Sequence, residues 1–119
     1  MKYMIRNGQA VAVIDQSVKI ADVQTVLDLM ADARYSCDCI AMAVYKESFS
    51  EDFFNLKTRF AGDVLQKFSN YRFKLAIVGD FGMYDSKALR DFIYECNKGN
   101  LVFFKASLEE ALEALTRKQ

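Results

Sequence analysis

Residues 74–87, KLAIVGDFGMYDSK, contain the unit from which the rest of the fold can be predicted. The run KLAIV is apolar at nearly every position, which is typical of a strand covered on both faces. Gly79 and Gly82 then relax the backbone in a short loop, and Asp85 or Ser86 can cap the helix that follows. A buried strand joined to a helix by a short loop indicates an α/β domain with a mostly parallel sheet.

The same alternation of strands and helices runs through the whole chain. Residues 2–15 predict a hairpin, because the Asn7-Gly8 pair suits the two positive-φ positions of a type I′ turn. Helical spacing of apolar residues and continuous apolar runs then predict, in order, a helix over 18–33, a strand over 39–45, a helix over 51–69, a strand over 73–78, a helix over 86–98, a strand over 101–106 and a helix over 107–118. We therefore predict a single α/β domain, residues 1–119, with a mixed, mostly parallel five-stranded sheet.

Composition narrows the classes of partner. Hydrophobic residues make up 52% of the chain, and 16 basic residues balance 16 acidic ones. Nucleic-acid binders usually carry a basic excess, because phosphate neutralisation supplies most of their affinity. The apolar runs are too short to span a bilayer, and the start MKYMIRNGQ lacks the apolar core of a signal peptide. We expect a cytoplasmic protein with neither nucleic-acid nor membrane partners.

The lack of histidine and the spacing of the cysteines exclude several kinds of catalytic and metal site. The chain has no histidine, which excludes Ser-His and Cys-His nucleophile pairs and His-ligated zinc or haem. Its three cysteines lack C-x-x-C spacing, which argues against a structural zinc site and a disulfide framework. Cys39 and Cys96 fall on apolar faces and are predicted to be buried thiols, whereas Cys37 is predicted to be the most exposed. We expect no metal and no cofactor.

The loop after the strand at 74–78 fails as a phosphate cradle. A Walker loop needs lysine directly after its last glycine, whereas GDFGMYDSK puts Asp80 inside the loop and Lys87 after the serine. An acid there repels phosphate. We interpret the loop as a strand-to-helix connection.

Acidic residues nevertheless follow two of the predicted strands. Asp15 and Asp80 stand at the carboxyl ends of their strands, where ligands of open α/β sheets bind, and Lys46 and Lys105 end two others. One hypothesis is therefore a small-molecule or anion site, possibly a magnesium-dependent enzyme, that uses Asp15 and Asp80 as acid, base or metal ligands. It requires both carboxylates to face one concave pocket within about 10 Å of each other.

The helix predicted over 51–69 carries an uncharged polar stripe beside its apolar arc. At 3.6 residues per turn, the stripe consists of Asn55, Thr58, Gly62, Gln66 and Ser69. Small neutral groups suit close approach by a partner, although a crowded edge of the core would select the same residues. Our candidate partner or ligand surface is this stripe with Asp80 and Ser86. Lys57 and Arg59 are candidate anion contacts.

Two long segments resemble a known bacterial family. They are FFNLKTRFAGDVLQKFSNYRFKLAIVGDF, residues 53–81, and SKALRDFIYECNKGNLVFF, residues 86–104. Both resemble the uncharacterised family called domain of unknown function 4180, which has no established activity. The resemblance places these residues in the family's motif: Thr58, Gly62, Gln66, Lys67, Asn70, Tyr71, Gly79, Asp80, Ser86, Arg90, Asn97 and Gly99. The family usually has glycine where this chain has Arg59, and commonly aspartate where it has Asn55.

The order of elements also resembles the STAS, or anti-sigma-factor antagonist, fold. Proteins of that fold bind a kinase-like partner and are phosphorylated on a serine at the start of the second main helix. Ser48 and Ser50 lie at that point and are weak phosphoacceptor candidates, because Glu47, Glu51 and Asp52 would repel a phosphate.

Two functional hypotheses follow. The first is a regulatory or protein-interaction domain without enzymatic activity, which binds a protein partner or a second copy of itself. The second is the small-molecule or anion site around Asp15 and Asp80.

Overall fold

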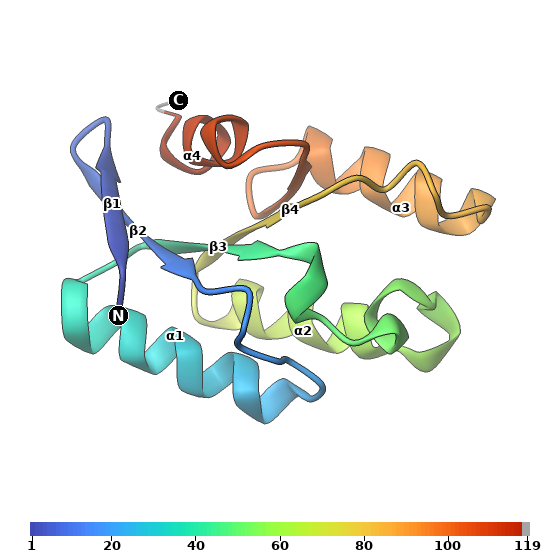
Figure 1. The fold of residues 1–119 in the computed structure, drawn as a ribbon, viewed down its shortest axis with the longest axis horizontal. Coiled ribbons are helices and arrows are strands. Elements are labelled where there is room, and N and C mark those ends of the chain that lie inside the picture. The colour runs from blue at the N-terminus through green and yellow to red at the C-terminus, as the bar shows by residue number, and fades with distance from the viewer. Residues whose placement is uncertain (118–119) are drawn as a thin grey trace.

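A computed structural model describes residues 1–117 and contains a five-stranded sheet with the order β1-β2-β3-β4-β5 (Figure 1). The strands are β1 Tyr3–Arg6, β2 Gln9–Ile14, β3 Ala41–Tyr45, β4 Lys74–Val78 and β5 Val102–Lys105. β1 is antiparallel to β2, and all the other neighbours are parallel. The predicted single α/β domain with a mixed, hairpin-started sheet is confirmed.

Four α-helices accompany the sheet, and side chains cap three of them. They are α1 Val23–Cys37, α2 Phe60–Asn70, α3 Lys87–Lys98 and α4 Leu108–Thr116. Ser86 Oγ accepts a hydrogen bond from Leu89 N at 3.1 Å, and Ser107 Oγ accepts one from Glu110 N at 3.2 Å. Of the two residues predicted to cap α3, Ser86 is therefore the cap, and the α1 cap is Asp22, which accepts from Thr25 N at 2.8 Å.

The strand order determines which face each helix covers. From β2 to β5 every crossover is expected to be right-handed and moves in the same direction, which puts the connecting helices on one face. α1 and α2 lie together below the sheet in Figure 1, and α3 lies at its β5 edge with its apolar residues in the same core cluster. α4 alone covers the other face, against alternate strand residues such as Val11, Ala43 and Phe103.

The hairpin turn follows its prediction closely. Asn7 and Gly8 both have positive φ, at 54° and 76°. The Asn7 amide also donates to Thr116 Oγ1 at 3.0 Å, so the turn is tied to the last residue of α4. The terminal helix was predicted through residue 118, but it ends at Thr116, and Lys118 lies outside the described residues.

The prediction of one helix over 51–69 is wrong. The segment forms two short 3-10 helices, Glu51–Phe54 and Leu56–Thr58, before α2 begins at Phe60. Arg59 lies between the second 3-10 helix and α2. It has φ 67° and ψ 4°, the left-handed conformation, through which no α-helix can continue. Its neighbours form turns instead, since Thr58 Oγ1 donates to Asp52 O at 2.7 Å. The apolar spacing misled the prediction because 3-10 turns also bury residues three apart.

Candidate functional site

The structure does not bring Asp15 and Asp80 into one site. Their strands, β2 and β4, are separated by β3, and the cavity at the carboxyl end of β2 is lined by Asp15 but not by Asp80. Each carboxylate binds its own turn: Asp15 Oδ1 accepts from Ser17 N at 2.8 Å, and Asp80 Oδ1 from Gly82 N at 2.9 Å. Within residues 1–117 no three acidic or cysteine side chains cluster as metal ligands would.

Aromatic rings pack together near the carboxyl end of β4. Phe54 stacks on Tyr84 with 5.2 Å between ring centroids, and Phe81 packs edge-on against Phe104 at 5.2 Å. Phe81 and Tyr84 come from the loop after β4, so this loop closes over the strand ends. Burial and the nearby Glu51 carboxylate raise the pKa of Tyr84 to about 12. The end of the sheet near β4 is thus filled with protein.

The lysine expected to bind anions at this rim is already engaged. Lys46 Nζ donates to the carbonyl of Asp80 at 2.9 Å and lies 5.0 Å from the centroid of the Tyr84 ring. Its aliphatic stem also occupies the space beside Gly79, where a Cβ atom would lie 2.7 Å from Lys46 Cβ. Glycine at position 79 is therefore required for this close approach.

The polar stripe predicted on one helix is not continuous. Asn55 and Thr58 lie before α2 begins, where Asn55 Oδ1 accepts from Lys57 N and Thr58 Oγ1 accepts from Phe60 N. Gln66 lies within α2, and its side chain donates to Asn70 at 3.0 Å. Gly62 faces open space. Most of these side chains therefore cap turns or bind locally rather than form one surface.

Four other residues of the family motif also have structural roles. Asn97 Oδ1 accepts from Phe104 N at 2.8 Å and so joins α3 to β5. Ser86 caps α3, and Gly99 ends it. Asp80 holds the loop after β4 through Gly82 N. These positions maintain the architecture at the ends of elements.

The candidate anion contacts and phosphoacceptors differ in access. Lys57 and Arg59 are both exposed, so they are free to meet a ligand. Ser48 is 1% exposed, and its hydroxyl lies 3.4 Å from the carbonyl of Asp15. Ser50 Oγ is buried too. In this conformation neither serine hydroxyl is accessible to a kinase.

One cavity opens where the aromatic layer does not reach, at the carboxyl end of β2. Its volume is about 500 Å³, in the range of small-molecule sites. Apolar side chains form much of its wall: Met1, Val13, Ile14, Val18 and Leu29. Lys2, Asp15, Gln16 and Tyr45 supply its polar groups. The sequence pointed to Asp15 at this end of the sheet but not to Lys2 or Leu29, which come from distant segments.

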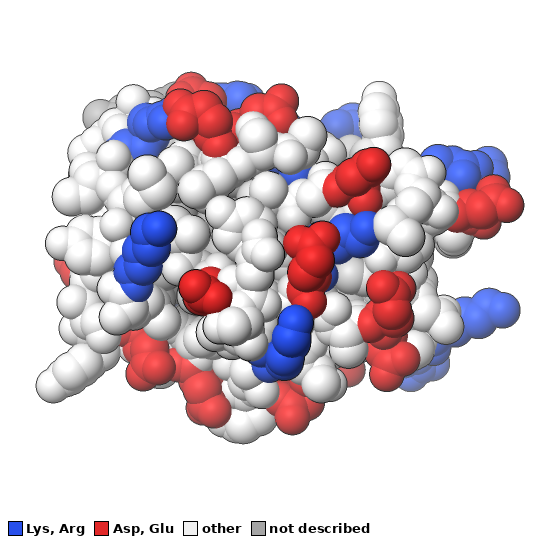
Figure 2. Space-filling view, viewed as in Figure 1, with Lys and Arg blue, Asp and Glu red and all other residues white. Residues whose placement is uncertain are grey.

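The outer edge of β1 is the most exposed apolar part of the sheet. Ile5 is 67% exposed, Tyr3 49% and Met4 39%. No other strand of the described residues pairs with this edge, since β1 ends the sheet order. On the face of Figure 2, charges of both signs are scattered between broad uncharged areas. The edge therefore combines exposed apolar side chains with backbone groups that face no other strand.

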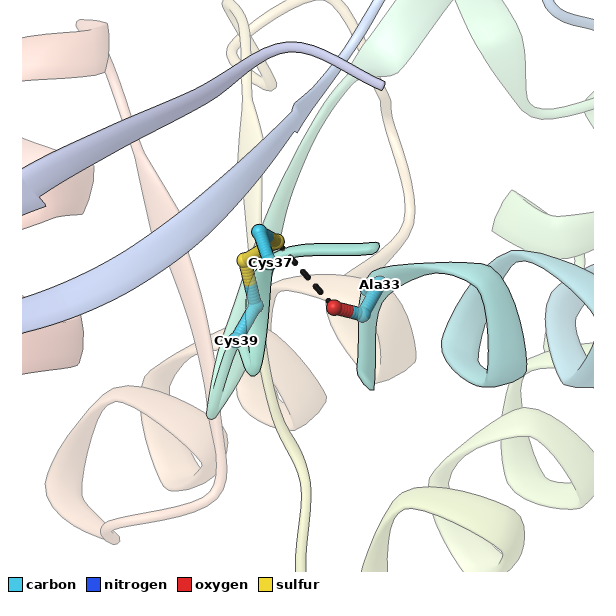
Figure 3. Close-up of a disulfide and its surroundings, with 3 residues drawn as sticks. All are labelled: Ala33, Cys37 and Cys39. Carbon is cyan, nitrogen blue, oxygen red and sulfur yellow. Dashed lines mark hydrogen bonds between the residues drawn. A yellow bond between two sulfur atoms is a disulfide. The ribbon is translucent and has the colours of Figure 1, made fainter. Parts of the chain in front are cut away.

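All three cysteines were predicted to be thiols, but two of them form a disulfide. Cys37, the last residue of α1, and Cys39 form a disulfide, shown in Figure 3. The left-handed conformation of Asp38, at φ 52°, reverses the chain so that their Cα atoms lie 5.2 Å apart, within the usual disulfide range. Cys37 Sγ also lies 3.1 Å from the carbonyl of Ala33. Cys96 is the free thiol, and burial raises its pKa to about 11.

The chain was compared with known proteins. Residues 6–115 match the sequence profile of a family described as "Domain of unknown function (DUF4180)". The chain belongs to this family. No curated protein and no solved structure matches the DUF4180 chain. No helix of its described part has the length and apolar composition needed to cross a membrane.

Proposed function

We propose that this DUF4180 domain is a protein-interaction domain without enzymatic activity, and that it binds its partner along the edge of β1. The observation that carries the proposal is the exposure of Ile5, Tyr3 and Met4 on an unpaired edge strand. Exposed edges are templates for another strand, and proteins normally keep them short, charged or covered. An edge that exposes three consecutive apolar residues favours binding by strand addition.

The backbone pairing indicates which residues would bind the partner strand. Val13 N donates to Lys2 O at 2.9 Å, so Lys2 and Val13 form a hydrogen-bonded pair. In an antiparallel ladder such pairs alternate. The N–H and C=O groups of Met4 therefore face β2, and those of Tyr3 and Ile5 face away from the sheet. Two residues of β1 thus offer free donors and acceptors to an added strand.

The charges at the two ends of β1 indicate the chemistry of the partner. Lys2 stands before the strand, and Arg6 at its end is already paired with Glu109 and with Glu113, the latter at 3.5 Å. An antiparallel segment with apolar residues opposite Tyr3 and Ile5 and an acid opposite Lys2 would fit this edge. We also propose a regulatory role in the cytoplasm like that of STAS proteins; the order of the elements supports the likeness to that fold.

The experiment uses Ile5→Pro. Because the Ile5 N–H faces away from β2, proline there keeps the hairpin but removes a donor from the outer edge. Partner recovery from the native host should fall for Ile5→Pro and stay unchanged for Tyr94→Lys, a control on the exposed apolar Tyr94 of α3. Gly62→Arg tests the alternative surface on α2, where the added side chain meets open space. Loss of the partner with Gly62→Arg but not with Ile5→Pro would refute the β1 surface.

A further inference from the structure

We propose that the cavity at the carboxyl end of β2 binds a small zwitterion with an apolar body, of the class of the apolar α-amino acids. The site lies beside β1 and includes Lys2, which also stands next to the partner surface proposed above, so its test uses the chain without a partner. It rests on opposite charges in one apolar cavity, on the rigidity of the turn that carries the acid, and on the position of the cavity at the carboxyl end of a parallel strand.

Opposite charges line the cavity without forming an ion pair. Lys2 and Asp15 both contribute to its wall, and no ion pair joins them among the salt bridges of residues 1–117. An ammonium group fits the Asp15 carboxylate, and a carboxylate fits Lys2. A ligand with one charge of either sign would leave the other protein charge unmatched, so a zwitterion satisfies both.

The Asp15 carboxylate is held in place before any ligand arrives. Asp15 Oδ1 accepts from Ser17 N at 2.8 Å, and its backbone carbonyl accepts from Val18 N at 3.0 Å. The Ser17 hydrogen bonds are also the main reason that the pKa of Asp15 is lowered, so the group is a carboxylate at neutral pH. A preorganised charge binds a ligand at lower entropic cost than a mobile one.

The apolar wall of the cavity indicates that the ligand has an apolar side chain. Val13 and Ile14 from β2, Val18 from the following turn and Leu29 from α1 line the cavity on several sides. A branched or aromatic side chain would cover this wall, at about 25 cal/mol per Å² of apolar surface removed from water. Glycine would leave it exposed. The Tyr45 phenol and the Gln16 amide are further polar groups within reach of the same cavity.

The location agrees with the general behaviour of α/β sheets, which bind ligands beyond the carboxyl ends of their strands. In this chain Phe81 and Tyr84, from the loop after β4, pack against Phe104 and Phe54 near the carboxyl end of β4. The end of β2 remains open, beside the antiparallel hairpin. The same end was predicted from the sequence to hold a ligand through Asp15, but with Asp80 as its partner; the structure replaces Asp80 by Lys2.

The test is calorimetric titration of the full chain, with any affinity tag at the C-terminus because Met1 and Lys2 line the cavity. Leucine, methionine and phenylalanine are the zwitterionic probes. Isopentylamine and 4-methylpentanoate carry the leucine body with one charge each, and glycine carries both charges without the body. We expect at least one of the three apolar amino acids to bind, and to do so about ten-fold or more tightly than all these analogues.

Substitutions then assign each charge. Asp15→Asn still accepts from Ser17 N, so it removes the charge and keeps the turn; it should weaken amino-acid binding about ten-fold and leave 4-methylpentanoate unaffected. Lys2→Gln should weaken amino-acid binding and leave isopentylamine unaffected. Asp22→Asn and Lys19→Gln, outside the cavity, are the matched controls. No binding of any apolar amino acid at millimolar concentration, binding equal to that of a singly charged analogue, or binding unchanged by both cavity variants would each overturn the proposal.

Discussion

Replacing Arg59 by glycine should stabilise the domain. Arg59 has φ 67° and ψ 4° at the junction of the second 3-10 helix with α2. A side chain in this left-handed conformation costs about 1–2 kcal/mol because its Cβ crowds the following carbonyl. Glycine removes this cost but loses about 0.5–1 kcal/mol more backbone entropy on folding. The exposed Arg59 side chain has no ion pair among those of the described residues, so the expected net gain in unfolding free energy is about 0.5–1 kcal/mol.

A matched control separates this effect from the general effect of glycine. Arg90 is an exposed arginine inside α3, where glycine should cost about 1 kcal/mol. For a chain of this length, 1 kcal/mol shifts the melting temperature by about 4 °C. Arg59→Gly should therefore melt roughly 6–8 °C above Arg90→Gly in thermal unfolding followed by circular dichroism. A third variant, Arg59→Val, should melt below wild type, since β-branched residues rarely adopt positive φ.

The reasoning is refuted if Arg59→Gly and Arg90→Gly lower the melting temperature equally. That outcome would mean that position 59 behaves as an ordinary helical site. Urea denaturation checks the same ranking without heat. An unchanged slope of unfolding free energy against urea concentration would show that the variants unfold the same structure. The glycine that the family usually carries at this position is the residue that the local backbone favours.

Three other measurements test separate features of the structure. Thiol titration of the unfolded, unreduced chain should detect Cys96 alone, and titration after reduction should detect all three cysteines. In the folded chain Cys96 should react slowly, because burial raises its pKa to about 11. Three thiols without reduction would contradict the Cys37–Cys39 disulfide. The pKa of Tyr84 is about 10 in the unfolded chain and about 12 in the folded one, so the unfolding free energy should fall as pH rises above 10. The fall should be smaller in Tyr84→Phe than in wild type. An equal fall in both would show that Tyr84 is not the cause. Ser86→Ala should lower the unfolding free energy by about 1 kcal/mol through loss of the α3 cap, measured by urea denaturation with Ser36→Ala, near the end of α1, as control.

The sequence predicted the elements whose signals are local. Asn7-Gly8 identified the hairpin turn, and continuous apolar runs identified β2 to β5, because strands covered on both faces need apolar residues at every position. Ser86 marked the start of α3 through the hydrogen bond that its own side chain accepts. Each of these features depends on a few neighbouring residues, so one sequence was sufficient.

The features that were missed depend on backbone conformation or on distant segments. Arg59 and Asp38 have positive φ although neither is glycine, and these residues ended the predicted long helix and closed the disulfide. The cavity gathers residues from the N-terminal segment, the turn after β2 and two other elements, as Lys2, Asp15, Leu29 and Tyr45 show. Nothing in the spacing of these residues indicates that they converge. The Asp15–Asp80 hypothesis required both residues to line one cavity, and Asp80 does not line the cavity that contains Asp15.

The position of α4 has a consequence for synthesis of the chain on a ribosome. α1, α2 and α3 can pack on their face of the sheet as soon as β5 has emerged, since all of them precede it. The opposite face, with Val11, Ala43 and Phe103, has only α4 to cover it in this cluster. A chain that folds before α4 is in place would therefore leave this apolar face bare, and exposed apolar surface of that kind makes partly folded chains prone to aggregate. Release of α4 from the exit tunnel ends that exposure and ties the hairpin turn in place through Thr116.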